Sequence, residues 1–151
     1  MLRAAAAAAA LLLVLGCDGQ SPGGSDVFDL RALDGAALPQ VVATDGACSV
    51  RVVAGTLELA VDGAFGLRAE HRTSCDGSGT VLRSFRYFTG TWSEGAGRTL
   101  TFNVQATGQT GLVFTGRLEG GDEAAATSAV VAVPDIGPGP TPPMDARFER
   151  R

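Results

Sequence analysis

The fold is decided by the stretch from Cys48 to Cys75, which reads CSVRVVAGTLELAVDGAFGLRAEHRTSC. Apolar and polar side chains alternate in it, as in Leu57-Glu58-Leu59, and Asp62-Gly63 lies near its middle. Alternation with a period of two is typical of a half-buried strand, and Asp-Gly is typical of a tight turn because it tolerates positive φ. The stretch therefore predicts a long antiparallel β-hairpin.

The alternation shifts by one residue in the first arm of this hairpin. The apolar positions are even-numbered at Val50 and Val52, but they are odd-numbered from Val53 onward. A slip of one residue beside Ala54-Gly55 indicates a β-bulge, which inserts one residue and bends the strand. Because barrels use bulges to curve their sheets, this position favours a coiled sheet.

The register of the hairpin brings its two cysteines together. A turn at Asp62-Gly63 pairs residues whose numbers sum to 125, the bulge lowers the sum to 124, and a three-residue loop lowers it to 123. Cys48 and Cys75 sum to 123, so we expect them to face each other at a separation that fits a disulfide. The alternative is a metal site, for which His71 is the nearest further ligand and no fourth donor is suitably spaced. We predict a Cys48–Cys75 disulfide.

The same alternation recurs on both sides of the hairpin, and Asp-Gly or Gly-rich turns separate the segments. Residues 134–143 hold five prolines and are expected to form a loop, because proline cannot lie inside a sheet. We predict strands at Val27–Leu33, Gln40–Thr44, Cys48–Val61, Ala64–Thr73, Thr80–Trp92, Arg98–Gln105, Gly111–Leu118 and Ser128–Val133, with a candidate closing strand at Ala146–Arg150.

Sequential strands joined by short turns favour an up-and-down meander, and closure removes its exposed edges. The predicted fold is all-β: one domain over residues 27–151, an antiparallel meander of about eight strands that is closed or nearly closed. If Ala146–Arg150 is a strand, it should pair with Val27–Leu33 and point Phe148 inward. A two-sheet sandwich would use the same alternation and is the alternative.

Several short motifs of the chain are similar to those of the small lipocalin-like barrels found in many bacterial lipoproteins. This resemblance extends over roughly Val27 to Arg151 and implies a barrel in which a small apolar ligand could lie. The motifs that carry it are Gly55-Thr-Leu-Glu-Leu59 leading to Asp62-Gly-Ala-Phe65, then Thr89-Gly-Thr-Trp92, Thr99-Leu-Thr-Phe102 and Phe114-Thr-Gly-Arg-Leu118.

Residues 1–16 are predicted to be a signal peptide. The apolar run from Ala4 to Leu15 would reach only about 18 Å as a helix, which is too short to span a membrane. Its end, Val14-Leu-Gly-Cys17, resembles a lipobox, which implies a diacylglycerol on Cys17, cleavage before it and acylation, for example by palmitate, of the new amino terminus. An ordinary secretory leader is the alternative.

The predicted lipid on Cys17 places the chain in the cell envelope, with its membrane as the partner. Residues 17–26 are then the lipidated cysteine and a flexible tether, because Gln20 to Ser25 is rich in glycine and serine. Asp18 leaves the choice between inner and outer membrane open.

The composition excludes several classes of function. The chain has 12 basic and 16 acidic residues and a formal net charge of −4, without a basic cluster, so nucleic acid is not an expected partner. No catalytic motif, metal set or cofactor motif is present. The one histidine, His71, is interpreted with Arg68 and Arg72 as a solvated strand end, and an anion site is the alternative. We therefore expect a protein that is not an enzyme and has no cofactor.

Two functional classes remain. In one, the barrel holds a small apolar ligand, and four aromatic residues are candidates to line its site: Phe85, Tyr87, Trp92 and Phe102. In the other, these aromatics are core, the barrel is filled, and the protein is a structural or protein-interaction module. Plentiful glycine and alanine with few aromatics leave both open.

Overall fold

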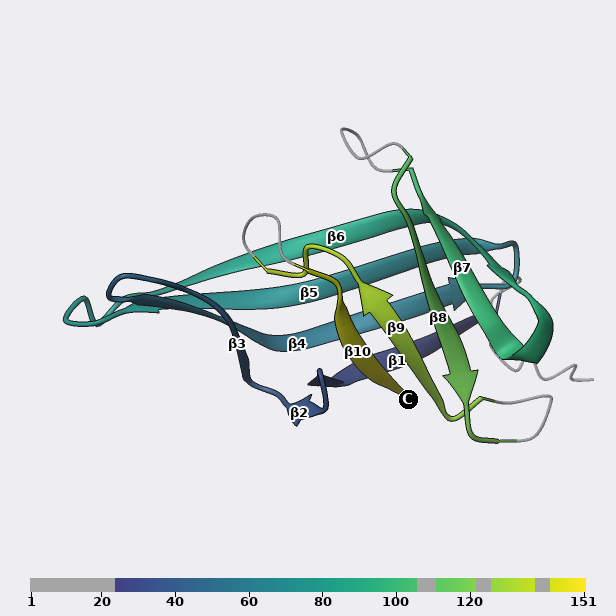
Figure 1. Ribbon diagram of the computed structural model, residues 1–151, viewed down its shortest axis with the longest axis horizontal. Coiled ribbons are helices and arrows are strands. Elements are labelled where there is room, and N and C mark those ends of the chain that lie inside the picture. Colours follow the sequence, from purple (N-terminus) through teal and green to yellow (C-terminus); the bar gives the residue numbers. More distant parts are fainter. Residues whose placement is uncertain (1–23, 106–110, 122–125, 138–141) are drawn as a thin grey trace, which may run out of the picture.

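The computed structural model describes residues 24–105, 111–121, 126–137 and 142–151, and these are almost entirely strands (Figure 1). A single 3-10 turn, Ala96–Arg98, interrupts them. The strands are β1 Ser25–Leu33, β2 Ala36–Ala37, β3 Gln40–Asp45, β4 Cys48–Ala60, β5 Ala64–Cys75, β6 Val81–Glu94, β7 Thr99–Val104, β8 Val113–Glu119, β9 Ser128–Val133 and β10 Met144–Arg150.

Eight of these strands form a closed antiparallel barrel, which confirms the predicted fold. The chain runs from β4 through β10 with each strand beside the next, β10 pairs with β1, and β1 pairs with β4. Phe148 lies opposite Leu30 and is fully buried, as expected for a closing strand. The β1–β4 contact, which we call the seam, skips over β2 and β3. Pairing between strands that are consecutive in sequence therefore does not by itself close the barrel.

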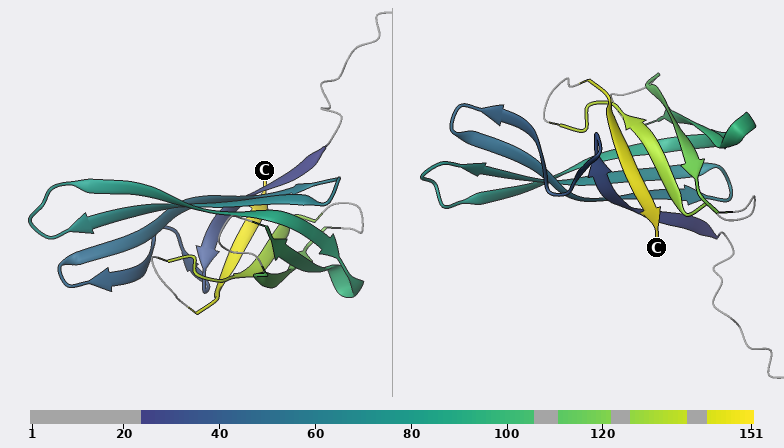
Figure 2. Two further views of the ribbon diagram at one scale, coloured as in Figure 1. Left: turned by 90° about the horizontal axis from the view of Figure 1, so that it is seen from above. Right: turned by 60° about the horizontal axis from the view of Figure 1, so that its bottom comes forward.

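An extension, which we call the wing, adjoins the barrel. It consists of β3 and the adjoining ends of three long strands: Cys48–Val53 of β4, Glu70–Cys75 of β5 and Val81–Arg86 of β6. Figures 1 and 2 show it projecting from one end of the barrel. The predicted strand Gln40–Thr44 therefore exists, but it lies in the wing and not in the barrel wall.

The hairpin of β4 and β5 has the predicted register. Three residues, Val61–Gly63, connect its strands, and the pairing shifts between Val52 and Ala54, so Val53 is the bulged residue. Below that bulge Cys48 is opposite Cys75, and the two form a disulfide at the tip of the wing. Loop length and bulge together thus fix a contact between residues 27 positions apart.

The interior of the barrel is filled by its own side chains. Six of the seven phenylalanines are buried, and four of their rings pack against one another. Ile136, from the loop after β9, is fully buried in the same core on the wing side. At the opposite end Trp92 packs on the core and donates its indole N–H to the carbonyl of Ala60. Core packing of this kind stabilises the fold by burying apolar area.

The domain begins slightly earlier than predicted. β1 starts at Ser25, so the predicted tether of residues 17–26 overlaps the first two residues of the barrel. The predicted signal peptide and Cys17 lie outside the described residues. In the described part of the chain, no helix has the length and apolar character needed to cross a membrane.

Candidate functional site

An opening in the seam of the barrel arises where β4 changes its neighbour. Residues Thr56–Ala60 of β4 pair with β1, whereas residues Cys48–Val52 pair with β3. Between the two ladders, Val53–Gly55 has no strand partner on this edge among the described residues. The bulge at Val53 twists β4 at this point, so the seam splits instead of continuing along β1.

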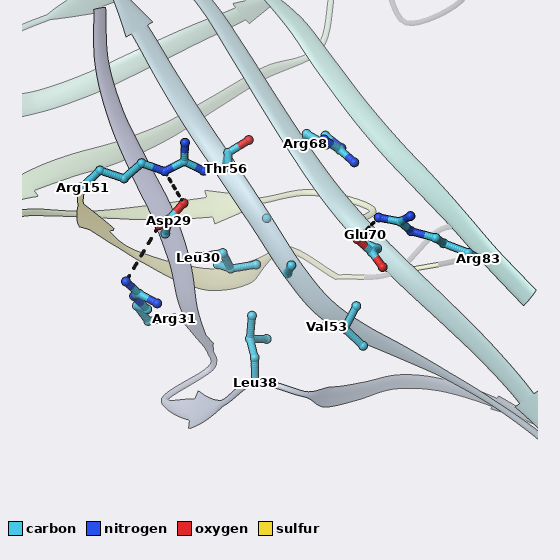
Figure 3. Close-up of a pocket in the computed structure, with 12 residues that line it drawn as sticks. Asp29, Leu30, Arg31, Leu38, Val53, Thr56, Arg68, Glu70, Arg83 and Arg151 are labelled. Carbon is cyan, nitrogen blue, oxygen red and sulfur yellow. Dashed lines mark hydrogen bonds and ion pairs between the residues drawn. The ribbon is translucent and has the colours of Figure 1, made fainter. Parts of the chain in front are cut away.

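A groove of about 600 Å³ occupies this opening. Its inner part is apolar, and in Figure 3 the side chains of Leu30 and Leu38 point into the gap between β1 and β4. Arginines stand on both sides of it, Arg31 and Arg151 on one and Arg68 and Arg83 on the other. The volume is in the range typical of small-molecule sites.

On the β1 side of the groove the charges are mutually compensated. A carboxylate oxygen of Asp29 lies 2.9 Å from Nε of Arg151 and the other lies 3.8 Å from Arg31. Arg31 also lies 3.4 Å from Glu149. Because these groups are largely exposed, we expect each pair to contribute little to stability and to exchange partners readily.

On the β5 side a carboxylate is held between two arginines. Glu70 is only 8% exposed, although it points to the outer face, and it accepts a 2.7 Å hydrogen bond from Arg83 and a longer one from Arg72. The hydrogen bond from Arg83 lowers the pKa of Glu70, and this effect exceeds the rise that burial causes. Glu70 is therefore ionised at neutral pH and neutralises these two arginines only in part.

Arg68 differs from the other arginines of the groove. Its guanidinium lies 4.2 Å from the centre of the Phe85 ring, and Arg83 lies 4.8 Å from the same ring. Within the described residues Arg68 has no carboxylate partner. Stacking holds the flat face of a guanidinium and leaves its N–H edge free to bind an anion.

The outer face of the wing adds further positive charge. Arg51, Arg72 and Arg83 lie directly opposite one another across β4, β5 and β6. Like charges in directly opposite positions are destabilising. Glu70 is the carboxylate that lies against this row, and it bonds two of the three arginines.

The four aromatic residues that sequence analysis proposed as ligand-lining are not brought together. Phe102 is fully buried in the core, and Trp92 is half-buried at the barrel end. Phe85 and Tyr87 lie on the outer face, 36% and 55% exposed, so their proposed position in the barrel interior is wrong. The reason is parity: Phe88 faces inward, and odd-numbered residues of β6 alternate with it.

The interpretation of His71 as a solvated strand end is also wrong. His71 is 5% exposed on the inner face, and its Nε2 lies 2.5 Å from the carbonyl oxygen of Ile136, to which it donates. Arg68 and Arg72 lie on the opposite face of β5. Burial lowers the pKa of His71, and nearby Arg86 lowers it further, while the hydrogen bond opposes both.

Most of the groove was not predicted from the sequence. The alternation of β5 shows that Arg68, Glu70 and Arg72 share the outer face, and that signal was available. No sequence signal predicts that β1 and Arg151 line the groove, because their position there depends on the β1–β4 seam. Over the described ranges, no three His, Cys, Asp or Glu residues gather in a way that could hold a metal ion.

No protein-family model, curated protein or solved structure matches this chain.

Proposed function

We propose that this protein is a lipid-anchored, non-catalytic interaction module of the cell envelope. In this proposal the barrel is a rigid scaffold, and binding takes place on its outer surface at the seam groove. The lipid on Cys17 keeps the domain at a membrane. An apolar ligand inside the barrel, the other class open from the sequence, is the less favoured function.

The observation that carries this choice is the filled interior. Rings of Phe65, Phe88, Phe102 and Phe114 pack on one another at centroid distances of 4.9 to 5.9 Å. Ile136 is buried on the wing side of the core. A ligand could enter only by displacing these contacts, and a close-packed core resists such displacement.

Titration with benzene, followed by methyl NMR of Leu57 and Leu67, tests the filled interior. We expect no saturable change in the parent chain. A Phe88→Ala variant is the positive control, because it would create a cavity lined by apolar groups, and such cavities bind benzene. Saturable binding to the parent with shifts at both leucines would overturn the interaction-module proposal.

Metabolic labelling with a fatty-acid analogue tests the anchor. We expect the label on the parent chain and on a Cys48→Ser/Cys75→Ser variant, but not on Cys17→Ser. Equal labelling of Cys17→Ser would exclude lipidation at this residue.

A further inference from the structure

We propose that the seam groove binds amphiphilic anions, that is, a carboxylate or phosphate group attached to an apolar chain. This inference rests on the proposed function in taking the outer surface as the binding side. It adds the chemistry of the ligand and the residue that recognises it, Arg68.

The anionic group is selected by the charge of the groove. Its lining contains four arginines, Arg31, Arg68, Arg83 and Arg151, against two carboxylates, in a chain whose formal net charge is −4. The carboxylates are engaged with other arginines, which leaves Arg68 as the lining cation without an acidic partner in the described chain. A planar guanidinium binds carboxylate and phosphate oxygens through two parallel hydrogen bonds.

The position of Arg68 is fixed before a ligand arrives. Phe85 holds its guanidinium at 4.2 Å, so binding an anion does not require a free side chain to be ordered. Arg83 lies 4.8 Å from the same ring and adds to the local positive potential.

The apolar chain is selected by the inner part of the groove. Leu30, Leu38 and Val53 line it together with Ala54 and Gly55. Gly55 is required there, because a Cβ atom at this position would lie 2.8 Å from the carbonyl oxygen of Arg68 and 3.0 Å from Leu30. Apolar contact beside a fixed cation favours an amphiphile over a simple salt ion.

The open edge of β4 favours the same location. Main-chain groups of Val53–Gly55 on this edge have no strand partner among the described residues, so solvent or a ligand must satisfy them. A bound anion or its linking group can take that place. The seam therefore offers a cation, an apolar wall and free main-chain groups within one groove.

Isothermal titration of the leaderless chain carrying Cys17→Ser tests the proposal with four probes. Octyl phosphate and octanoate carry both parts of the ligand, octanol carries only the chain, and inorganic phosphate carries only the charge. We expect saturable binding of octyl phosphate or octanoate, at least tenfold tighter than either partial probe. Since this chain has no lipid, failure of the anchor and failure of the groove are measured separately.

Arg68→Gln should weaken binding of octyl phosphate or octanoate at least tenfold, because the unpaired guanidinium is lost. Arg98→Gln is the matched control: it removes the same charge, but its guanidinium donates to the carbonyl of Gly120, away from the groove. Arg68→Lys should recover only part of the affinity, since lysine keeps the charge without the planar fork.

Amide shift mapping on the parent chain gives a reading that does not depend on any variant folding. We expect changes at Leu30, Ala54, Thr56 and Arg68. Absence of binding, equal binding by Arg68→Gln, affinity for inorganic phosphate equal to that for octyl phosphate, or shifts confined to other surfaces would each overturn the proposal.

Sedimentation with vesicles separates the two sources of such an anion. Phosphatidylcholine vesicles with phosphatidylglycerol are compared with vesicles of phosphatidylcholine alone. Arg68-dependent binding to the anionic vesicles would support the proposal with a membrane lipid as the ligand. Binding of the soluble probes without vesicle binding would support it with a free amphiphile as the ligand.

Discussion

Single glycines allow neighbouring strands of the barrel wall to approach closely. Gly55, Gly90 and Gly116 lie in strands, and at each of them a Cβ atom would overlap a main-chain carbonyl of the adjacent strand. Gly90 and Gly116 both follow a buried phenylalanine by two residues, so the repeated Phe-Thr-Gly motif places a small residue inside the wall where neighbouring strands approach closely. Glycine is needed at these positions for space, and no positive φ is involved.

Gly90→Ala should lower the free energy of unfolding by about 2 kcal/mol or more, because the new methyl group would overlap the carbonyl oxygen of Asn103 and force β6 away from β7. Gly66→Ala in β5 is the control, since its Cβ would have nothing within 4 Å. That change should be neutral or slightly stabilising. Urea unfolding of both variants checks this, and equal losses would contradict it.

His71 should make the stability of the fold depend on pH. Burial lowers its pKa in the folded chain below the ordinary value of 6.5. Above pH 6.5 the imidazole is neutral in both states, so its contribution to stability is fully present. Below pH 6.5 the unfolded chain takes up a proton that the folded chain resists, and the free energy of unfolding falls until the pH reaches the folded pKa.

Urea unfolding between pH 7.5 and 5 measures this slope, and His71→Gln should remove most of it. No other histidine contributes, because the chain has one. Glu70, whose pKa is lowered from 4.5, loses its contribution only as the pH falls through and below that value, so the two effects separate. A slope that survives in His71→Gln would contradict the assignment.

Among the elements, the hairpin of β4 and β5 is the one that the sequence predicts in most detail. Its register follows from local features: a three-residue loop, a slip in alternation at Val53 and two cysteines. The position of β3 outside the barrel could not be predicted from the sequence. A strand that pairs with β4 has the same sequence pattern whether it belongs to the barrel wall or to the wing. The groove depends on the bulge at Val53 and on the position of β3, since it lies where β4 changes its partner from β1 to β3.

The disulfide should protect the wing and not the barrel. It joins Cys48 to Cys75 at the wing tip, beyond the buried rings. In a Cys48→Ser/Cys75→Ser variant the tip can fray while the barrel stays closed. Amide exchange should therefore accelerate at Ser49 and Ser74 and stay unchanged at Leu57 and Phe88.

The overall loss of stability in that variant should be smaller than the roughly 3.5 kcal/mol that chain entropy predicts for a loop of this length. Fraying of the tip raises the entropy of the folded variant and offsets part of the cost. Unfolding by urea measures the total. Faster exchange at Leu57 and Phe88 to the same degree as at the tip would show that the disulfide supports the whole barrel.

At the scale of the whole molecule, closure depends on the pairing of β1 with β10, the first and last strands among the described residues. β1 and β10 are adjacent, and Arg151 donates its main-chain N–H to the carbonyl of Val27. Alternation and an inward Phe148 predicted this contact from sequence. The β1–β4 contact on the other side of β1 could not be predicted, because it depends on how far β2 and β3 leave the barrel.

Removal of β10 should therefore abolish the folded monomer. A chain that ends at Pro143 loses Phe148 and leaves one edge of β1 and one edge of β9 without a partner. Free edges and an exposed core promote association, so we expect aggregation and loss of the near-ultraviolet dichroism of the buried aromatics. Size-exclusion chromatography and circular dichroism check this, with a chain ending at Arg150, which retains all of β10, as the control. A monomeric truncated chain with the dichroism of the parent would show that the barrel does not require β10 for closure.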